Sequence, residues 1–150
     1  MDLSDGTASD LSDAEFEQLL ALRTGLRRFV HWSEEQARNA GITPAQHQLL
    51  LAVRGHPGEA GPTIGELAGY LMLRPHSTSE LIDRAVGAGL VTRTHDPANA
   101  SIVRVGLTPS GTDKLRELSA THLQELAQLG PTMRALWKAI EQFDQGRTTA

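Results

Sequence analysis

The residues best suited to chemistry lie on one predicted helix, residues 75–88. Helical spacing places Thr78, Leu81, Ala85 and Ala88 on its inward face and leaves polar side chains on its outward face. Hydroxyl, imidazole and guanidinium groups on such a face can bond DNA phosphates or base edges, and a carboxylate can accept from the amino group of cytosine. The residues predicted to contact DNA from here are Arg74, His76, Ser77, Ser79, Glu80 and Arg84. The alternative for each of them is an ordinary solvated helix face.

The chain around this helix predicts a helix-turn-helix. Thr63 and Glu66 have the capping-box spacing that opens a short helix. Pro75 suits the first turn of the second helix because its missing N–H would have no partner there, and Gly89 suits a left-handed helix end. In helix-turn-helix units the second helix enters the major groove.

A β-hairpin is predicted directly after the second helix. Residues 90–94 and 101–105 are rich in β-forming side chains, and Asp96-Pro97-Ala98-Asn99 between them favours a turn. Residues 43–108 are therefore predicted to form a winged helix-turn-helix lobe, and the fold class is mainly α (α+β) with a two-stranded hairpin wing. A small α+β packing element that never meets nucleic acid would have the same order of elements.

Several short motifs in this region resemble one family. They are Gly65-Glu66-Leu67-Ala68, Leu81-Ile82-Asp83-Arg84, Gly89-Leu90-Val91, Asp96-Pro97 and Val105-Gly106-Leu107-Thr108-Pro109-Ser110-Gly111. Together, in this order, they look like the multiple-antibiotic-resistance regulator (MarR) family, over about Thr43 to Leu118. The resemblance implies a cytoplasmic, homodimeric transcription regulator, often a repressor relieved by a small ligand.

The predicted wing departs from that family's pattern at its tip. The family usually carries an acid followed by Arg there, whereas this sequence has Asn99-Ala100-Ser101. Contacts of the wing with DNA are therefore expected from Arg93, Arg104 and His95.

Composition narrows the function further. The chain has 150 residues, 39% of them hydrophobic, and its length suggests one domain over residues 1–150. It has no cysteine, which excludes disulfides and thiolate metal sites, and no apolar run long enough to span a membrane. The net charge is −4, and within residues 62–107 four Arg balance four acids. This balance predicts modest non-specific DNA binding with a shallow salt dependence.

Amphipathic helices flank the lobe. Residues 11–41 and 109–145 are predicted dimerisation helices, with a break at Gly130-Pro131, while residues 1–10 are predicted to be a disordered tail. Their apolar faces need a further surface, which a second copy of the chain would supply. A monomer that folds them back on itself is the alternative.

A small aromatic or anionic effector is the predicted ligand. Arg28, His31, Trp32 and His47 offer aromatic and polar contacts in a cleft expected between the dimerisation helices and the lobe, although packing alone would also explain them. No metal site or cofactor is predicted, because the six histidines form no compact ligand motif. No nucleophile elbow, phosphate loop or H-E-x-x-H motif suggests an enzyme.

Two functions follow from these observations. The first is a homodimeric regulator, a ligand-responsive repressor that binds double-stranded DNA at a pseudo-palindromic operator. The second is a winged-helix protein-interaction or anti-repressor module with weak or lost DNA binding, which the neutral lobe, Glu80 and the Arg-less wing tip favour.

Overall fold

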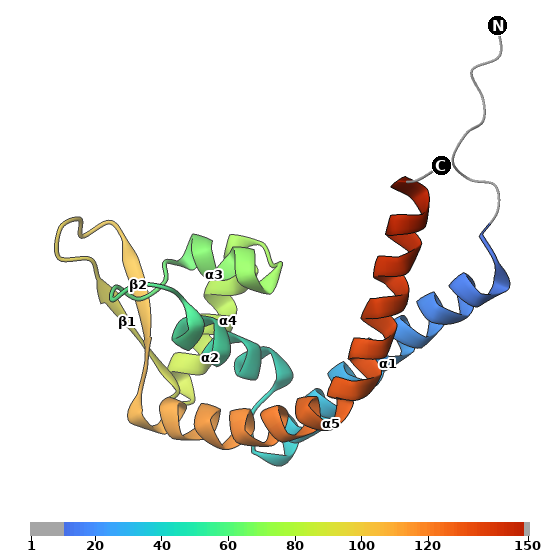
Figure 1. Cartoon of the computed structure of the whole chain (residues 1–150). Coiled ribbons are helices and arrows are strands. Elements are labelled where there is room, and N and C mark those ends of the chain that lie inside the picture. The colour runs from blue at the N-terminus through green and yellow to red at the C-terminus, as the bar shows by residue number, and fades with distance from the viewer. Residues whose placement is uncertain (1–10, 149–150) are drawn as a thin grey trace, which may run out of the picture. The chain divides into compact units, whose positions relative to one another are not determined.

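The computed structural model describes residues 11–148, with side chains to Gln145, so the predicted tail over residues 1–10 lies outside it. Five helices and one two-stranded sheet follow the predicted order, and the fold class is confirmed (Figure 1). The elements are α1 (Asp13–Asn39), α2 (Pro44–Gly55), α3 (Ile64–Leu71), α4 (Pro75–Gly87), β1 (Val91–His95), β2 (Val103–Leu107) and α5 (Pro109–Thr148).

These elements divide into two compact units. The first, Ser33–Leu123, is called the winged lobe below, and contains α2, α3, α4 and the hairpin with the adjoining ends of α1 and α5. The second, Met1–Trp32 with Gln124–Ala150, is called the helical arm, and consists of the remaining parts of α1 and α5.

The helices of the lobe begin where their sequences contain capping groups. The Thr63 Oγ1 atom accepts from the Glu66 N–H at 3.2 Å, and the Glu66 carboxylate accepts from the Thr63 N–H at 2.8 Å. Thr43 and Gln46 form the same reciprocal pair at the start of α2. Each pair satisfies backbone donors that the helix itself leaves free, which fixes the first turn.

A single apolar core holds the lobe together. Leu49 and Leu50 of α2 are fully buried with Leu67 of α3 and Ile82 of α4. The hairpin contributes buried residues too, and its strands pair antiparallel with Val91 opposite Leu107 and Arg93 opposite Val105. Packing of this kind fixes how α4 is presented, because burying its inner face turns its polar face outward.

Gly111 allows α5 to start close to the hairpin. A Cβ atom at this position would lie 2.0 Å from the Leu90 carbonyl oxygen, so a larger residue would force the helix away. The Thr108 N–H donates to the same carbonyl at 3.0 Å. The hairpin and the first turn of α5 are therefore fixed to each other by direct backbone contact.

The predicted break at Gly130-Pro131 is wrong. α5 runs as one helix through Pro131, which has no N–H to donate to the carbonyl four residues earlier. Proline's fixed φ is itself helical, so the helix loses a hydrogen bond at this point without having to end. None of the described helices is long and apolar enough to cross a membrane.

Candidate nucleic-acid interface

α4 is anchored by its inner face. Leu81 and Ala85 are buried as predicted, and Ile82 is buried beside them. The inward placement of Ala88 is wrong, because α4 ends at Gly87 and Ala88 is exposed as its C-cap. Thr78 is fully buried and its hydroxyl donates to the Arg74 carbonyl oxygen at 3.0 Å, which satisfies the one polar group on this face. Rotation of the helix about its axis would expose these groups, so its outward face is fixed.

That outward face carries the residues predicted to contact DNA. Arg74, His76, Ser77, Glu80 and Arg84 are exposed, and Ser79 is half-buried. The His76 Nε2 atom lies 3.2 Å from a Glu80 carboxylate oxygen, one helical turn away. The helix therefore presents donors and acceptors together over its first two turns.

The turn before α4 has an unusual backbone. Met72 caps α3 in the left-handed region, with φ 52° and ψ 41°, although it is not a glycine. The Leu73 N–H donates to the Ala68 carbonyl at 3.0 Å, which closes the end of α3. This tight turn lets Pro75 begin α4 at once.

Arg93 connects the wing to α4. Its guanidinium donates to the Asp83 carboxylate and to the Ser79 carbonyl oxygen, the latter at 3.2 Å. The contact of Arg93 with DNA stays a prediction, and in this structure the guanidinium is bonded to α4 instead. The Arg93–Asp83 pair holds β1 against α4.

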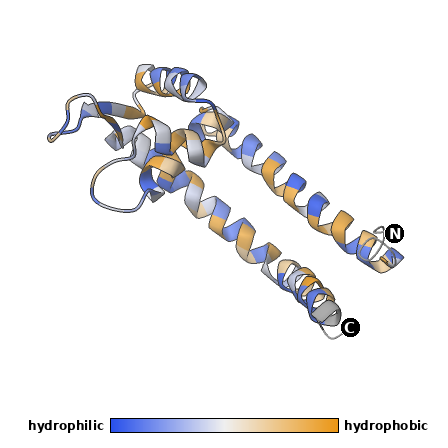
Figure 2. Ribbon diagram, turned by 90° about the horizontal axis from the view of Figure 1, so that it is seen from above, coloured by the Kyte–Doolittle hydropathy of each residue, from blue (hydrophilic) through white to orange (hydrophobic). Residues whose placement is uncertain are grey.

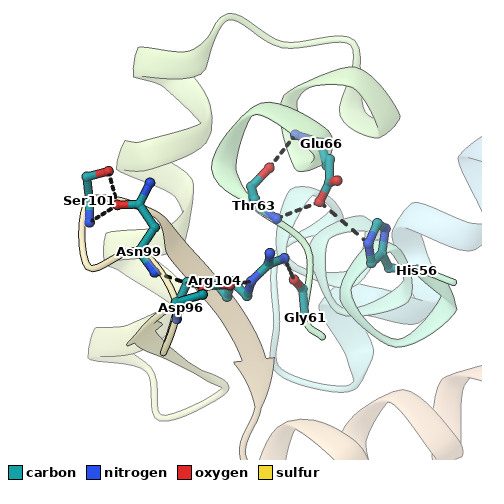
Figure 3. A network of polar contacts seen from close by, with 9 residues as sticks. His56, Gly61, Thr63, Glu66, Asp96, Asn99, Ser101 and Arg104 are labelled. Atoms are coloured by element: carbon teal, nitrogen blue, oxygen red, sulfur yellow. Dashed lines mark hydrogen bonds and ion pairs between the residues drawn. The ribbon is translucent and has the colours of Figure 1, made fainter. Parts of the chain in front are cut away.

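Arg104 is similarly occupied at the other strand (Figure 3). Its Nε donates to Asp96 at 2.6 Å and its Nη1 donates to the Gly61 carbonyl at 2.9 Å. The Arg104 hydrogen bond, followed by the Ala98 N–H, lowers the pKa of Asp96 below its ordinary value. Arg104 therefore ties the wing to the loop before α3.

The polar network continues into α3 (Figure 3). The Glu66 carboxylate accepts from the Thr63 N–H, and this bond is the main reason that the pKa of Glu66 is lowered. His56, at the end of α2, lies 3.5 Å from the same carboxylate and 3.0 Å from the Tyr70 hydroxyl. The α2–α3 loop is thereby held at both ends.

The wing tip bonds mainly to itself. The Asn99 Oδ1 atom accepts from the N–H and the hydroxyl of Ser101 at 3.1 and 2.6 Å (Figure 3). The His95 Nδ1 atom lies 2.8 Å from the Ala100 carbonyl oxygen. The residues that replace the family's usual tip pattern thus form a small closed turn.

The four predicted effector residues divide between the two units. Arg28 and Trp32 line a hollow of about 600 Å³ within the helical arm, whose wall also contains Leu20, Phe29 and Leu129. His31 is exposed on α1 and does not line that hollow. The structure therefore brings together two of the four.

His47, the fourth, is buried in the winged lobe. Its ring centroid lies 4.8 Å from that of His122, and His122 in turn lies 2.7 Å from the Ser33 hydroxyl. Burial, then the neighbouring His122, lowers the pKa of His47. Sequence spacing gave no sign of this pair, because 75 residues separate the two histidines. Among the described residues, no three His, Asp or Glu gather in a metal-binding group.

Comparison with known proteins identifies the lobe. The model of the MarR family matches residues 40–100, which include α2, α3, α4 and β1. The crystal structure of the MarR family transcription regulator SP03579 superimposes with a TM-score of 0.72 and 23% identity, over 91% of each chain. Residues 40–100 of this protein are therefore similar to the MarR family, and the whole chain has the fold of a MarR family structure.

Two further relatives of the MarR-like lobe bear on function. An uncharacterized HTH-type transcriptional regulator of Bacillus subtilis, YsmB, is 43% identical over 56 residues, which are 37% of this chain and 38% of YsmB. The transcriptional repressor CouR, solved bound to a 23-mer DNA duplex, is 26% identical with a TM-score of 0.64, over 91% of this chain and 99% of CouR. These relatives are transcription regulators rather than enzymes.

Proposed function

We propose that this protein is a homodimeric DNA-binding regulator of transcription whose α4 enters the major groove of a pseudo-palindromic operator. The supporting observation is the division of α4 into a buried face and a face of exposed polar side chains. A helix of this kind, backed by a core and followed by a hairpin, is how winged-helix proteins read DNA. The likeness to CouR, which was solved on DNA, favours the same use of the lobe.

Dimerisation is supported by the helical arm. Among its described residues, 11–32 and 124–145, no side chain is buried. Large apolar groups stay exposed along both helices, where Figure 2 shows hydrophobic stretches, and they include Phe16, Leu19, Leu20, Leu126 and Trp137. A second copy would cover them and hold two α4 helices about 34 Å apart, the spacing of successive major grooves.

Repression relieved by a small ligand is the proposed mode of control. The hollow in the helical arm is walled mostly by apolar groups, with Arg28 as a cation and Trp32 as an aromatic contact. The acids Glu17 and Glu125 also line the hollow, so it suits a small aromatic ligand whose single anionic group would have to meet Arg28. Such a ligand releases DNA only if it binds better to a dimer whose α4 helices are wrongly spaced.

Titration of the full chain with DNA from its own upstream region tests the proposed function. At two salt concentrations, saturable and sequence-selective binding is expected. Arg84→Ala removes an exposed cation of α4, so the slope of log affinity against log salt should become shallower by about 1. Arg116→Ala, which removes an exposed cation of α5, is the matched control and should leave the slope unchanged.

The alternative is a protein-interaction or anti-repressor module. It is favoured by the equal numbers of acidic and basic residues in 62–107 and by the engagement of Arg93 and Arg104 within the lobe. Under this alternative, no upstream fragment binds selectively even at low salt. A gel-filtration shift with a partner protein, retained in Arg84→Ala, would then replace DNA binding as the readout.

A further inference from the structure

α4 carries two acidic residues on its outward side, and the structure treats them differently. Asp83 is paired with the Arg93 guanidinium, which neutralises it. Glu80 instead pairs with an imidazole, that of His76, and its side chain remains 56% exposed. An exposed carboxylate on a surface that contacts DNA is repelled by the phosphates unless a base donates a hydrogen bond to it.

The position of Glu80 points toward bases rather than backbone. It is the sixth residue of α4, and the N-terminal part of a recognition helix is the part that reaches base edges. The Ser79 carbonyl and the Asp83 carboxylate, on either side of it, are both held by Arg93. The segment that carries Glu80 is therefore fixed from the wing side.

Major-groove chemistry then restricts which base can satisfy Glu80. Guanine offers two acceptors there, and thymine an acceptor beside a methyl group. Adenine offers an amino donor, but its N7 acceptor lies beside that donor and opposes the second oxygen of a carboxylate. Cytosine offers its N4 amino donor with an acceptor on one side only, the O6 of the paired guanine, whereas the adenine amino group has an acceptor on both sides.

We propose that Glu80, oriented by His76, is a specificity-determining residue that makes α4 select a cytosine in each half of the operator. The Nε2 atom of His76 lies 3.2 Å from one carboxylate oxygen, and the other oxygen is the one that would accept from cytosine N4. His76 acts as the positioning residue and Glu80 as the reading residue. The inference rests on the proposed DNA binding and names the base that this site requires.

The test is selection of DNA by the full chain from a pool with randomised half-sites. The wild-type protein is expected to select cytosine at one position of each half-site. Glu80→Gln should select adenine at that position alone, since an amide bonds adenine N6 and N7 together. In anisotropy titrations, replacing the cytosine should weaken wild-type binding by about 5- to 150-fold.

Two further variants separate base reading from charge. Glu117→Gln makes the same change of charge on α5, where Glu117 pairs with Lys114 at 3.8 Å, and should leave the selected sequence unaltered. His76→Ala should reduce the preference for cytosine by a larger factor than it reduces affinity for unrelated DNA, because a lost positioning contact affects discrimination more than phosphate binding.

Each result decides the matter. If Glu80→Gln selects the same sequence as the wild type, or binds every sequence more tightly by one common factor, Glu80 only repels phosphate and the inference is overturned. If the wild-type protein selects no DNA at low salt, the proposed function itself fails, and this inference fails with it. Circular dichroism of each variant confirms that the helices are retained.

Discussion

The winged lobe and the helical arm bury their side chains to opposite extents. The lobe encloses a core in which Leu49, Leu67 and Ile82 are fully buried, whereas no described side chain of the arm is buried. Both are built from amphipathic helices, so helix pattern alone does not explain the difference. The lobe is stabilised within one chain, and the arm presents apolar surface that a second chain can cover.

The largest expected effect is on the core of the lobe. Leu49→Ala removes a fully buried side chain and should lower the free energy of unfolding by about 2–5 kcal/mol. Leu20→Ala removes an exposed leucine of the arm and should lower the free energy of unfolding of the lobe by well under about 1 kcal/mol. Urea titrations at one fixed protein concentration compare the two. Equal costs would show that the arm is packed as tightly as the lobe.

The next largest effect is expected on dimerisation through the helical arm. Trp137 is 60% exposed on α5, and large exposed aromatics are typical anchors of interfaces. Trp137→Ala should raise the dimer dissociation constant by about ten- to thirty-fold in sedimentation equilibrium. Leu51→Ala, which removes a leucine of similar exposure from the lobe, is the control. A dimer weakened by the control and not by Trp137→Ala would place the interface on the lobe.

A smaller effect is expected at the turn before α4. Met72 adopts a left-handed backbone that costs an ordinary residue about 1–2 kcal/mol. Met72→Gly should relieve this cost, less about 0.5–1 kcal/mol for the greater freedom of glycine in the unfolded chain. A net gain in thermal stability is therefore expected. Leu73→Gly, next in the chain and without a positive φ, should instead destabilise the lobe.

The smallest effect is a change with pH. Burial lowers the pKa of His47, so in acid the unfolded chain takes up a proton that the folded lobe resists. The free energy of unfolding should therefore fall as the pH drops below about 6.5, the ordinary histidine value, and continue to fall until the folded pKa is passed. His47→Gln should flatten this dependence in urea titrations from pH 8 to pH 5. An unchanged slope would assign the effect to other groups.

Local signals in the sequence predicted most of the lobe. The capping pair at Thr63, the left-handed Gly89 and the buried Thr78 were each predicted, because each depends on residues within one or two turns. The prediction failed at Pro131, where a lost hydrogen bond did not end the helix. Helix propensity gives the free-energy cost of a proline within a helix, but it does not show whether the other interactions of that helix offset the cost.

Hydrogen-bonded pairs between different elements of the fold could not be predicted from the sequence. Arg93 and Arg104 were predicted to face DNA, and the structure shows them bonded to Asp83 and to Asp96 with Gly61. The sequence contains both acids and both arginines but not the fold that brings them together. The DNA contacts of the site residues therefore remain predictions that the titrations above address.

The attachment of the wing determines which of its residues can vary during evolution. Arg104 joins the hairpin to the Gly61 carbonyl and to Asp96 at the start of its loop, and the tip residues Asn99 and Ser101 bond each other. Replacements at the tip therefore leave the anchorage intact, and new side chains can be tried there without loss of the folded lobe. The sequence of the tip can therefore vary without altering how the wing is attached to the lobe.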